Sequence, residues 1–167
     1  MTVRIRIRRP YTGARFIHPL DPEPRTAVLA RGFEETKLVH IFPQGWNERA
    51  ARFAPTSIAG PIEQLRRAAR LGLRLEHAVV VFTYEGGAGL TPSDREWLWE
   101  SFEVPVFEQY LGPHNELLAA ECDAHCGLHV VTGCEDLDLE HDACACGNAA
   151  PRLSRGARIE ELVALLA

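Results

Sequence analysis

Apolar and polar residues follow two patterns along the chain, and each pattern predicts a type of element. Residues 78–83 form a short, β-branched apolar run, which is typical of a strand buried on both faces of a parallel sheet. Residues 37–42 form a similar run that ends at Pro43, so we expect a second buried strand with His40 as a hydrogen-bonded core histidine. Residues 104–107 predict the next strand of the same sheet.

Two helices are predicted on either side of the 78–83 strand. The first would begin with Thr56 or Ser57 as its cap and end at Gly72. The second would begin with Thr91 as its N-cap and Pro92 at the first helical position. Three large apolar side chains would form the buried face of this second helix: Trp97, Leu98 and Phe102. Strands and helices that alternate in this order predict right-handed crossovers and an α/β fold with a largely parallel sheet and flanking helices.

The pattern changes after Tyr110. Short apolar runs at residues 117–120, 128–131 and 137–139 predict a small antiparallel β region. Near the N-terminus, alternation over residues 3–7 predicts an edge strand, and residues 154–167 predict an amphipathic helix. We expect residues 1–167 to form one domain.

All five cysteines lie between Cys122 and Cys146, together with three of the seven histidines. Thiolate sulfur and imidazole nitrogen are the ligands that zinc prefers, and a structural zinc site needs four of them in a tetrahedron. Cys144 and Cys146 form one half-site, because two thiolates one residue apart can bind one ion and Gly147 permits the tight turn. We expect His141, which acidic residues flank, at the surface.

Two sets of partners can complete this half-site. If residues 128–131 form a strand, His129 faces away from Leu128, and Cys122 could approach it across a hairpin to give a Cys₃His site. Cys122 and Cys126 would instead give a Cys₄ site. Either set fills all four positions, which indicates a structural zinc ion. A zinc ion with three protein ligands and a bound water, which would favour hydrolysis, is the third alternative.

Composition narrows the class of function. The net charge of −5 argues against a general nucleic-acid binder. No apolar run approaches the roughly 20 residues that cross a bilayer, and the N-terminus lacks the apolar part of a secretory signal, so we expect a cytoplasmic protein. In that reducing compartment, an odd number of clustered cysteines favours metal binding over disulfides.

A glycine-rich segment follows the 78–83 strand directly and contains Gly86, Gly87 and Gly89. Its place between a strand and a helix is typical of a loop that approaches a nucleotide, although it lacks the ending of a P-loop and the GxGxxG spacing. A plain connection between strand and helix is the alternative interpretation. No Gly-x-Ser-x-Gly segment is present, so a serine nucleophile of that type is not expected.

Seven segments between residues 55 and 153 together carry a family resemblance. In chain order they are residues 55–60, 83–95, 104–110, 120–122, 127–130, 144–147 and 151–153. By their order and spacing, the chain resembles the phenylacetate–CoA ligase-like branch of the adenylate-forming (AMP-binding) enzymes. The resemblance covers about three fifths of the chain. It implies the nucleotide-binding half of the large domain of such an enzyme, preceded by a divergent part over residues 1–54.

The resemblance implies a zinc region over residues 117–150. The family's zinc ligands carry over to four residues of this sequence: Cys122, His129, Cys144 and Cys146. This is the Cys₃His set, and it leaves Cys126 and Cys134 as bystanders.

The resemblance also implies a ligand site. In the family, the glycine loop lies against the adenine and ribose of the nucleotide, so four residues are candidates for binding ATP, AMP or CoA: Gly86, Gly87, Gly89 and Tyr110. Glu116 is the residue of this sequence that best matches the glutamate that coordinates Mg²⁺ in the family. The motif at residues 110–116 contains an insertion and lacks the family's threonine.

The departures from the family shape the functional hypothesis. The sequence lacks the Ser/Thr/Gly-rich phosphate loop and the lid domain with its lysine, and its one lysine, Lys37, precedes the matching region. We therefore expect an accessory or non-catalytic zinc-binding module with a nucleotide or CoA pocket, which could act with a protein partner or as a homo-oligomer. The alternative is a minimal acyl-adenylating enzyme, alone or with a partner chain, in which Arg15, Arg95 or Arg152 would supply the missing positive charge.

Overall fold

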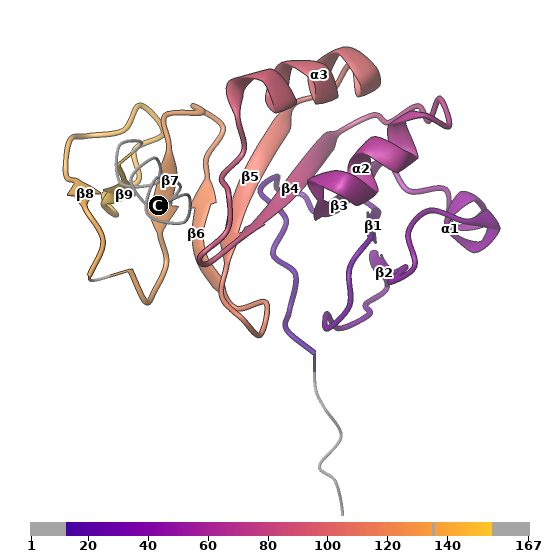
Figure 1. Cartoon of the computed structure of the whole chain (residues 1–167), viewed down its shortest axis with the longest axis horizontal. Helices are drawn as coiled ribbons and strands as arrows, with labels where there is room; N and C mark the ends of the chain where they lie inside the picture. The colour runs from indigo at the N-terminus through magenta and orange to yellow at the C-terminus, as the bar shows by residue number, and fades with distance from the viewer. Residues whose placement is uncertain (1–12, 135, 155–167) are drawn as a thin grey trace, which may run out of the picture.

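In the part of the chain that the structure describes, nine strands form one sheet in the order β2-β1-β3-β4-β5-β6-β7-β9-β8 (Figure 1). The computed structural model describes residues 13–134 and 136–154. In chain order, the strands are β1 (Thr26–Val28), β2 (Val39–Ile41), β3 (Ser57–Pro61), β4 (Ala78–Tyr84), β5 (Val106–Leu111), β6 (Leu117–Glu121), β7 (Leu128–Val130), β8 (Leu139–Glu140) and β9 (Arg152–Leu153). The helices are α1 (Glu48–Phe53), α2 (Ile62–Ala69) and α3 (Pro92–Phe102).

The sheet has a parallel half and an antiparallel half. Neighbouring strands from β2 to β5 are parallel, whereas β5–β6, β6–β7, β7–β9 and β8–β9 pair antiparallel. The antiparallel strands form the left part of Figure 1, away from the helices. This arrangement confirms the predicted α/β fold with a largely parallel sheet followed by a small antiparallel region.

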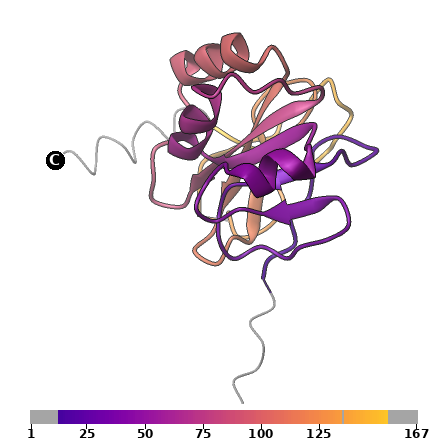
Figure 2. The same ribbon diagram turned by 90° about the vertical axis from the view of Figure 1, so that its right-hand side faces the viewer.

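The parallel half is buried on both faces, which explains the continuous apolar run in β4. Val79 and Val81 point to the face covered by the helices, where they pack with residues such as Leu98. Val80 and Phe82 point to the opposite face, where Phe16 of the N-terminal segment covers them. Figure 2 looks at the sheet from its β2 edge, with α1 in front.

The segment that contains Thr56 and Ser57 differs from the prediction. It does not cap a helix: Ser57–Pro61 is strand β3, and α2 begins only at Ile62 without a side-chain cap. Ser57 is fully buried because β3 lies between β1 and β4. Pairing with two strands distant in sequence therefore outweighs the local capping preference of serine.

The second helix and its neighbours agree with the prediction in part. The Thr91 side chain accepts a hydrogen bond from the Asp94 amide at the start of α3, and Leu98 and Phe102 are buried as expected. Trp97 is 38% exposed, so its placement on the buried face was wrong. His40 is half-buried in β2, with its ring stacked 4.0 Å from that of Phe53.

Two predicted terminal elements, the strand over residues 3–7 and the helix over residues 154–167, fall outside the described residues except for residue 154. Among the helices of the described part of the chain, none is long and apolar enough to cross a membrane.

A buried histidine ties the N-terminal segment to the sheet. Ser57 Oγ donates to the carbonyl of Ala78 at 2.7 Å, and His18 Nε2 lies 2.9 Å from the same Oγ. The Leu20 amide donates to His18 Nδ1 at 3.0 Å. His18 is therefore neutral with its proton on Nε2 and donates to Ser57. Burial lowers the pKa of His18 from 6.5 to about 4, and His77 acts in the same direction.

This pKa makes stability depend on pH. Between about pH 6.5 and pH 4 the unfolded chain binds a proton at His18 that the folded chain does not, so acidification favours unfolding. Between about pH 7.5 and pH 5, we expect the unfolding free energy of His18→Gln to fall by about 2 kcal/mol less than that of the wild type, in urea titrations of the zinc-loaded protein. His114→Gln, at an exposed position in the turn after β5, is the control. Equal losses for wild type and His18→Gln would contradict the assignment.

Candidate metal centre and adjacent pocket

A tight turn after β8 presents the first pair of thiols. The amide of Gly147 donates to the carbonyl of Cys144 at 3.0 Å, and Gly147 adopts a left-handed φ of 80° that favours glycine. The amide of Asn148 donates to Cys146 Sγ at 3.3 Å. The turn thus holds both thiols and supplies a hydrogen bond that stabilises a thiolate.

The β6–β7 hairpin presents the other two side chains. His129 pairs with Ala120 across the hairpin, and Cys122 lies two residues beyond Ala120. Because side chains alternate along a strand, Cys122 and His129 share one face. The amide of His125 donates to the carbonyl of Cys122 at 3.0 Å and turns the chain at the end of β6.

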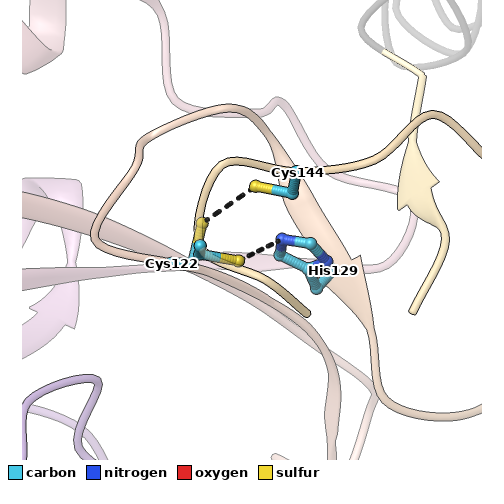
Figure 3. A group of neighbouring side chains, drawn as sticks. Cys122, His129 and Cys144 are labelled. Atoms are coloured by element: carbon cyan, nitrogen blue, oxygen red, sulfur yellow. Dashed lines mark hydrogen bonds between the residues drawn. The ribbon is translucent and has the colours of Figure 1, made fainter. Parts of the chain in front are cut away.

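The four ligand atoms of Cys122, His129, Cys144 and Cys146 all lie within 4.8 Å of one another. The sulfurs of Cys122 and Cys144 are 3.6 Å apart (Figure 3), and Cys146 Sγ is 3.4 Å from His129 Nε2. In a tetrahedral zinc site, ordinary bond lengths place two sulfurs about 3.8 Å apart and a sulfur and nitrogen about 3.6 Å apart. All five cysteines are free thiols. The four residues therefore form a group that could hold a metal ion.

The orientation of His129 suits metal binding. His129 is only 4% exposed, and its Nδ1 lies 3.0 Å from the carbonyl of Ala150. Nδ1 must carry the proton to donate this bond, which leaves the lone pair of Nε2 directed at the sulfurs. Such a backbone partner is common for metal-binding histidines.

The thiols differ in acidity. The pKa of Cys144 is lowered to about 6, mainly by a hydrogen bond from the backbone amide of Cys146. The amide of Asn148 lowers the pKa of Cys146, but desolvation and the neighbouring Cys144 and Cys122 outweigh it and raise that pKa to about 11. These crowded thiols cannot all ionise together, because the thiolates repel one another. A bound cation would relieve that repulsion, so the group favours metal binding.

The remaining candidates in the cysteine-rich region do not belong to this group, although the Cys126 thiol interacts with that of Cys144. Cys126 is exposed and Cys134 is buried in a small apolar cluster, and neither belongs to the four-residue group. His141 is exposed. The structure thus groups His129, and not Cys126 of the Cys₄ alternative, with the other three cysteines.

A pocket of about 900 Å³ lies beside the metal group, between α3, the start of β5 and the β6–β7 hairpin. Glu121 and Leu128 line it, and each immediately precedes a residue of the metal group in the sequence. Strand alternation therefore directs Cys122 and His129 to one face of the hairpin, and Glu121 and Leu128 to the other.

A network of buried charges forms one wall of the pocket. Glu121 Oε2 accepts hydrogen bonds of 2.9 Å from Arg95 and from the amide of Glu108. His125 Nδ1 lies 3.2 Å from Glu121 Oε1. Glu108 Oε1 accepts from Thr83 at 2.8 Å. This network could not be predicted from the sequence, because its members come from four separate segments. Its one signal in the sequence is a glutamate next to a cysteine ligand.

The glycine segment and the hairpin after β5 lie next to each other. Gly86 has a φ of 74°, and the amide of Gly87 donates to the carbonyl of Tyr84 at 2.9 Å to close a tight turn. The amide of Glu85 donates to the carbonyl of Leu111 at 2.9 Å, which joins the two loops at the ends of β4 and β5. Gly89, the last glycine of the segment, lines the pocket.

Tyr110 and Glu116 have structural contacts at this edge of the sheet. Tyr110 is 3% exposed and packs in the apolar cluster of the antiparallel half, with Leu118 and Leu128. Glu116 is exposed, and its Oε2 accepts from the amide of His114 at 2.8 Å within the hairpin turn. Lys37 is exposed next to β2, at the far edge of the sheet from β5.

Comparison with known proteins shows similarity in fold. No protein-family model matches the sequence, and no curated protein matches it. Among solved structures, the chain is similar to an open conformation of 2-hydroxyisobutyryl-CoA ligase in complex with 2-HIB-AMP and CoA, with a TM-score of 0.55 and 12% sequence identity. The match covers 80% of this chain and 44% of that chain, so this chain spans less than half of the ligase's length. The likeness concerns the fold, and at that level it agrees with the similarity to adenylate-forming enzymes inferred from the sequence.

Proposed function

We propose that this chain is a zinc-stabilised binding module, related to the phenylacetate–CoA ligase-like branch of the adenylate-forming enzymes, that binds an adenine nucleotide or CoA-type ligand. On this proposal it does not carry out the complete ligase reaction alone. The observation that carries the proposal is that the ligand atoms of Cys122, His129, Cys144 and Cys146 lie within 4.8 Å of one another.

The donor set favours zinc in a structural role. Three sulfurs and one imidazole nitrogen form a Cys₃His set, which is a common structural zinc site. With four protein ligands the ion has no open position for water, so the arrangement disfavours the hydrolytic alternative. The zinc ion would link the β6–β7 hairpin to the turn before β9, next to the short β7–β9 pairing and a small apolar cluster. We expect about one zinc ion per chain by elemental analysis.

The neighbouring loops after β4 and β5 support a nucleotide or CoA site. The structurally similar ligase was solved with 2-HIB-AMP and CoA. A glycine turn allows a ligand to approach the backbone closely, and Gly86 and Gly87 form such a turn beside the β5–β6 hairpin. Because Tyr110 is buried, the ligand would contact the backbone of these loops more than the tyrosine ring.

The positions of two ionisable groups argue against adenylation by this chain alone. Phosphoryl chemistry requires positive charge beside the reacting phosphorus. Lys37 lies at the opposite edge of the sheet, three strands away from β4. The carboxylate of Glu116, the candidate for holding Mg²⁺, bonds to the His114 amide in its own turn.

Ligand binding at the glycine turn can be tested with a matched pair of variants. We expect AMP or CoA to bind the zinc-loaded protein in calorimetric titrations, and Gly86→Val to weaken that binding at least tenfold. Gly72→Val is the control: Gly72 also has a positive φ, 66°, and a Cβ added at either glycine would meet no atom within 4 Å, but Gly72 lies in another loop. Both variants should lose similar stability. Equal binding by the two variants would place the ligand elsewhere.

The alternative function is a minimal acyl-adenylating enzyme. The same glycine turn and hairpin favour it, and in this alternative a partner chain or second copy supplies the catalytic lysine. ATP–pyrophosphate exchange with a panel of carboxylic acids separates the two hypotheses. We expect no exchange from the chain alone, and clear exchange would overturn the proposal in favour of the enzyme.

A further inference from the structure

The pocket beside the metal group is large enough for a small organic molecule and shares one residue with the loops assigned to the nucleotide. Its volume is about 900 Å³, and its walls come from α3, the start of β5, the β6–β7 hairpin and Leu153. Of the residues assigned to nucleotide binding, Gly89 alone lines it. An occupant of this pocket therefore need not be the ligand of the proposed function.

The wall formed by α3 and the strands is largely apolar. Trp99 lines the pocket from α3 and is 57% exposed, although large aromatic side chains are usually covered. Val106, Leu128 and Leu153 continue this apolar surface. Such a wall favours a ligand with an apolar, preferably aromatic, body that covers the indole ring.

The charged groups of the pocket carry an excess of negative charge. Among the residues that the structure describes, three carboxylates line it, from Glu96, Glu108 and Glu121, against one guanidinium, that of Arg95. Glu108 is 5% exposed and the Glu121 side chain 4%, so water screens these two carboxylates poorly. His125 is the remaining titratable group of the lining.

Arg95 is already engaged by the protein. Its Nη1 donates to the carbonyl of Val106 at 2.6 Å, and its Nη2 donates to Glu121 at 2.9 Å. An anionic ligand would have to compete with Glu121 for this guanidinium and would face the other carboxylates at close range. A cationic ligand meets no such repulsion, and Trp99 offers an aromatic face for it.

We propose that this pocket binds a small apolar or aromatic molecule that carries one ammonium group. The ammonium lies toward Glu108 and Glu121, and the apolar body lies against Trp99 and Leu128. Carboxylates, phosphates and CoA-type anions are excluded by charge. The proposal does not depend on nucleotide binding at the glycine turn.

Three probes of the same shape test the charge preference. We expect 2-phenylethylammonium to bind the zinc-loaded full chain about tenfold or more tightly than 2-phenylethanol, and 3-phenylpropionate to show no binding. Binding is measured by calorimetry and by quenching of tryptophan fluorescence at constant ionic strength. Equal or tighter binding of the alcohol or the carboxylate would overturn the proposal, as would the absence of binding by all three.

Variants then locate the ammonium. Glu108→Gln keeps an acceptor for Thr83 but removes the charge, and it should weaken 2-phenylethylammonium about tenfold. Glu100→Gln removes an exposed charge from α3 outside the pocket lining and should leave the affinity unchanged. Trp99→Leu should weaken binding and abolish most of the quenching. Equal affinity of wild type and Glu108→Gln, with both folded by circular dichroism, would refute the site.

Discussion

Cys144→Ser should abolish zinc binding and unfold the antiparallel half of the sheet while leaving the parallel half folded. The parallel half has two extensive apolar clusters, one on each face of β4. Within residues 13–134 and 136–154, the antiparallel half has one cluster of six buried residues: Tyr110, Leu118, Ala119, Leu128, Cys134 and Leu153. A core of this size offsets little of the chain entropy of residues 112–154, so most of their stability must come from the metal.

Amide hydrogen exchange measures this effect region by region. In the zinc-loaded wild type, the amides of β6 and β7 should exchange slowly, and in Cys144→Ser they should exchange nearly as in an unfolded chain. The amides of β4 should stay protected in both proteins. Removal of zinc from the wild type with a chelator should reproduce the variant's pattern.

Cys126→Ser is the matched control for this experiment. Cys126 is a free thiol from the same region, but it is exposed and lies outside the four-residue group. The variant should keep about one zinc ion and the protection of the wild type. A Cys144→Ser protein that lacks zinc but retains slow exchange in β6 and β7 would show that the metal has no structural role.

The metal group could be predicted because local rules determine it. The position of Cys122 relative to His129 follows from side-chain alternation in a hairpin with a short connection, and Gly147 marks the tight turn of the Cys144–Cys146 pair. Each half-site thus depends on contacts between residues close in sequence. The family resemblance then favoured one ligand set over the alternative that contains Cys126.

Features that depend on long-range pairing could not be predicted in the same way. Ser57 has the local properties of a helix cap, and its place in β3 depends on β1 and β4. Likewise, Arg95 and Glu121 meet because α3 crosses the start of β5 and β6 returns antiparallel to it. No periodic pattern in the sequence predicts such a contact, so the charged wall of the pocket could be identified only from the structure.

The ion pair between Arg95 and Glu121 should contribute strongly to stability, because only one partner is accessible to water. The Glu121 side chain is 4% exposed, whereas that of Arg95 is 33% exposed. Arg95→Met would leave a buried carboxylate without its cation. We expect a loss of about 2–3 kcal/mol in the free energy of unfolding, below the full cost of breaking a buried pair because Arg95 is partly solvated. Urea unfolding of the zinc-loaded protein at neutral pH measures it.

A double-mutant cycle distinguishes the ion pair from packing. Glu121→Gln removes the charge but can still accept the hydrogen bond from the Glu108 amide, so it should cost less than Arg95→Met. In the double variant no buried charge is left unpaired, and it should be more stable than Arg95→Met alone. Zinc content is measured for each variant, since Glu121 precedes Cys122. If the losses in unfolding free energy of the two single variants simply add, the uncompensated charge of Glu121 does not cause the loss. The cost of Arg95→Met then comes from the packing of its side chain along the pocket.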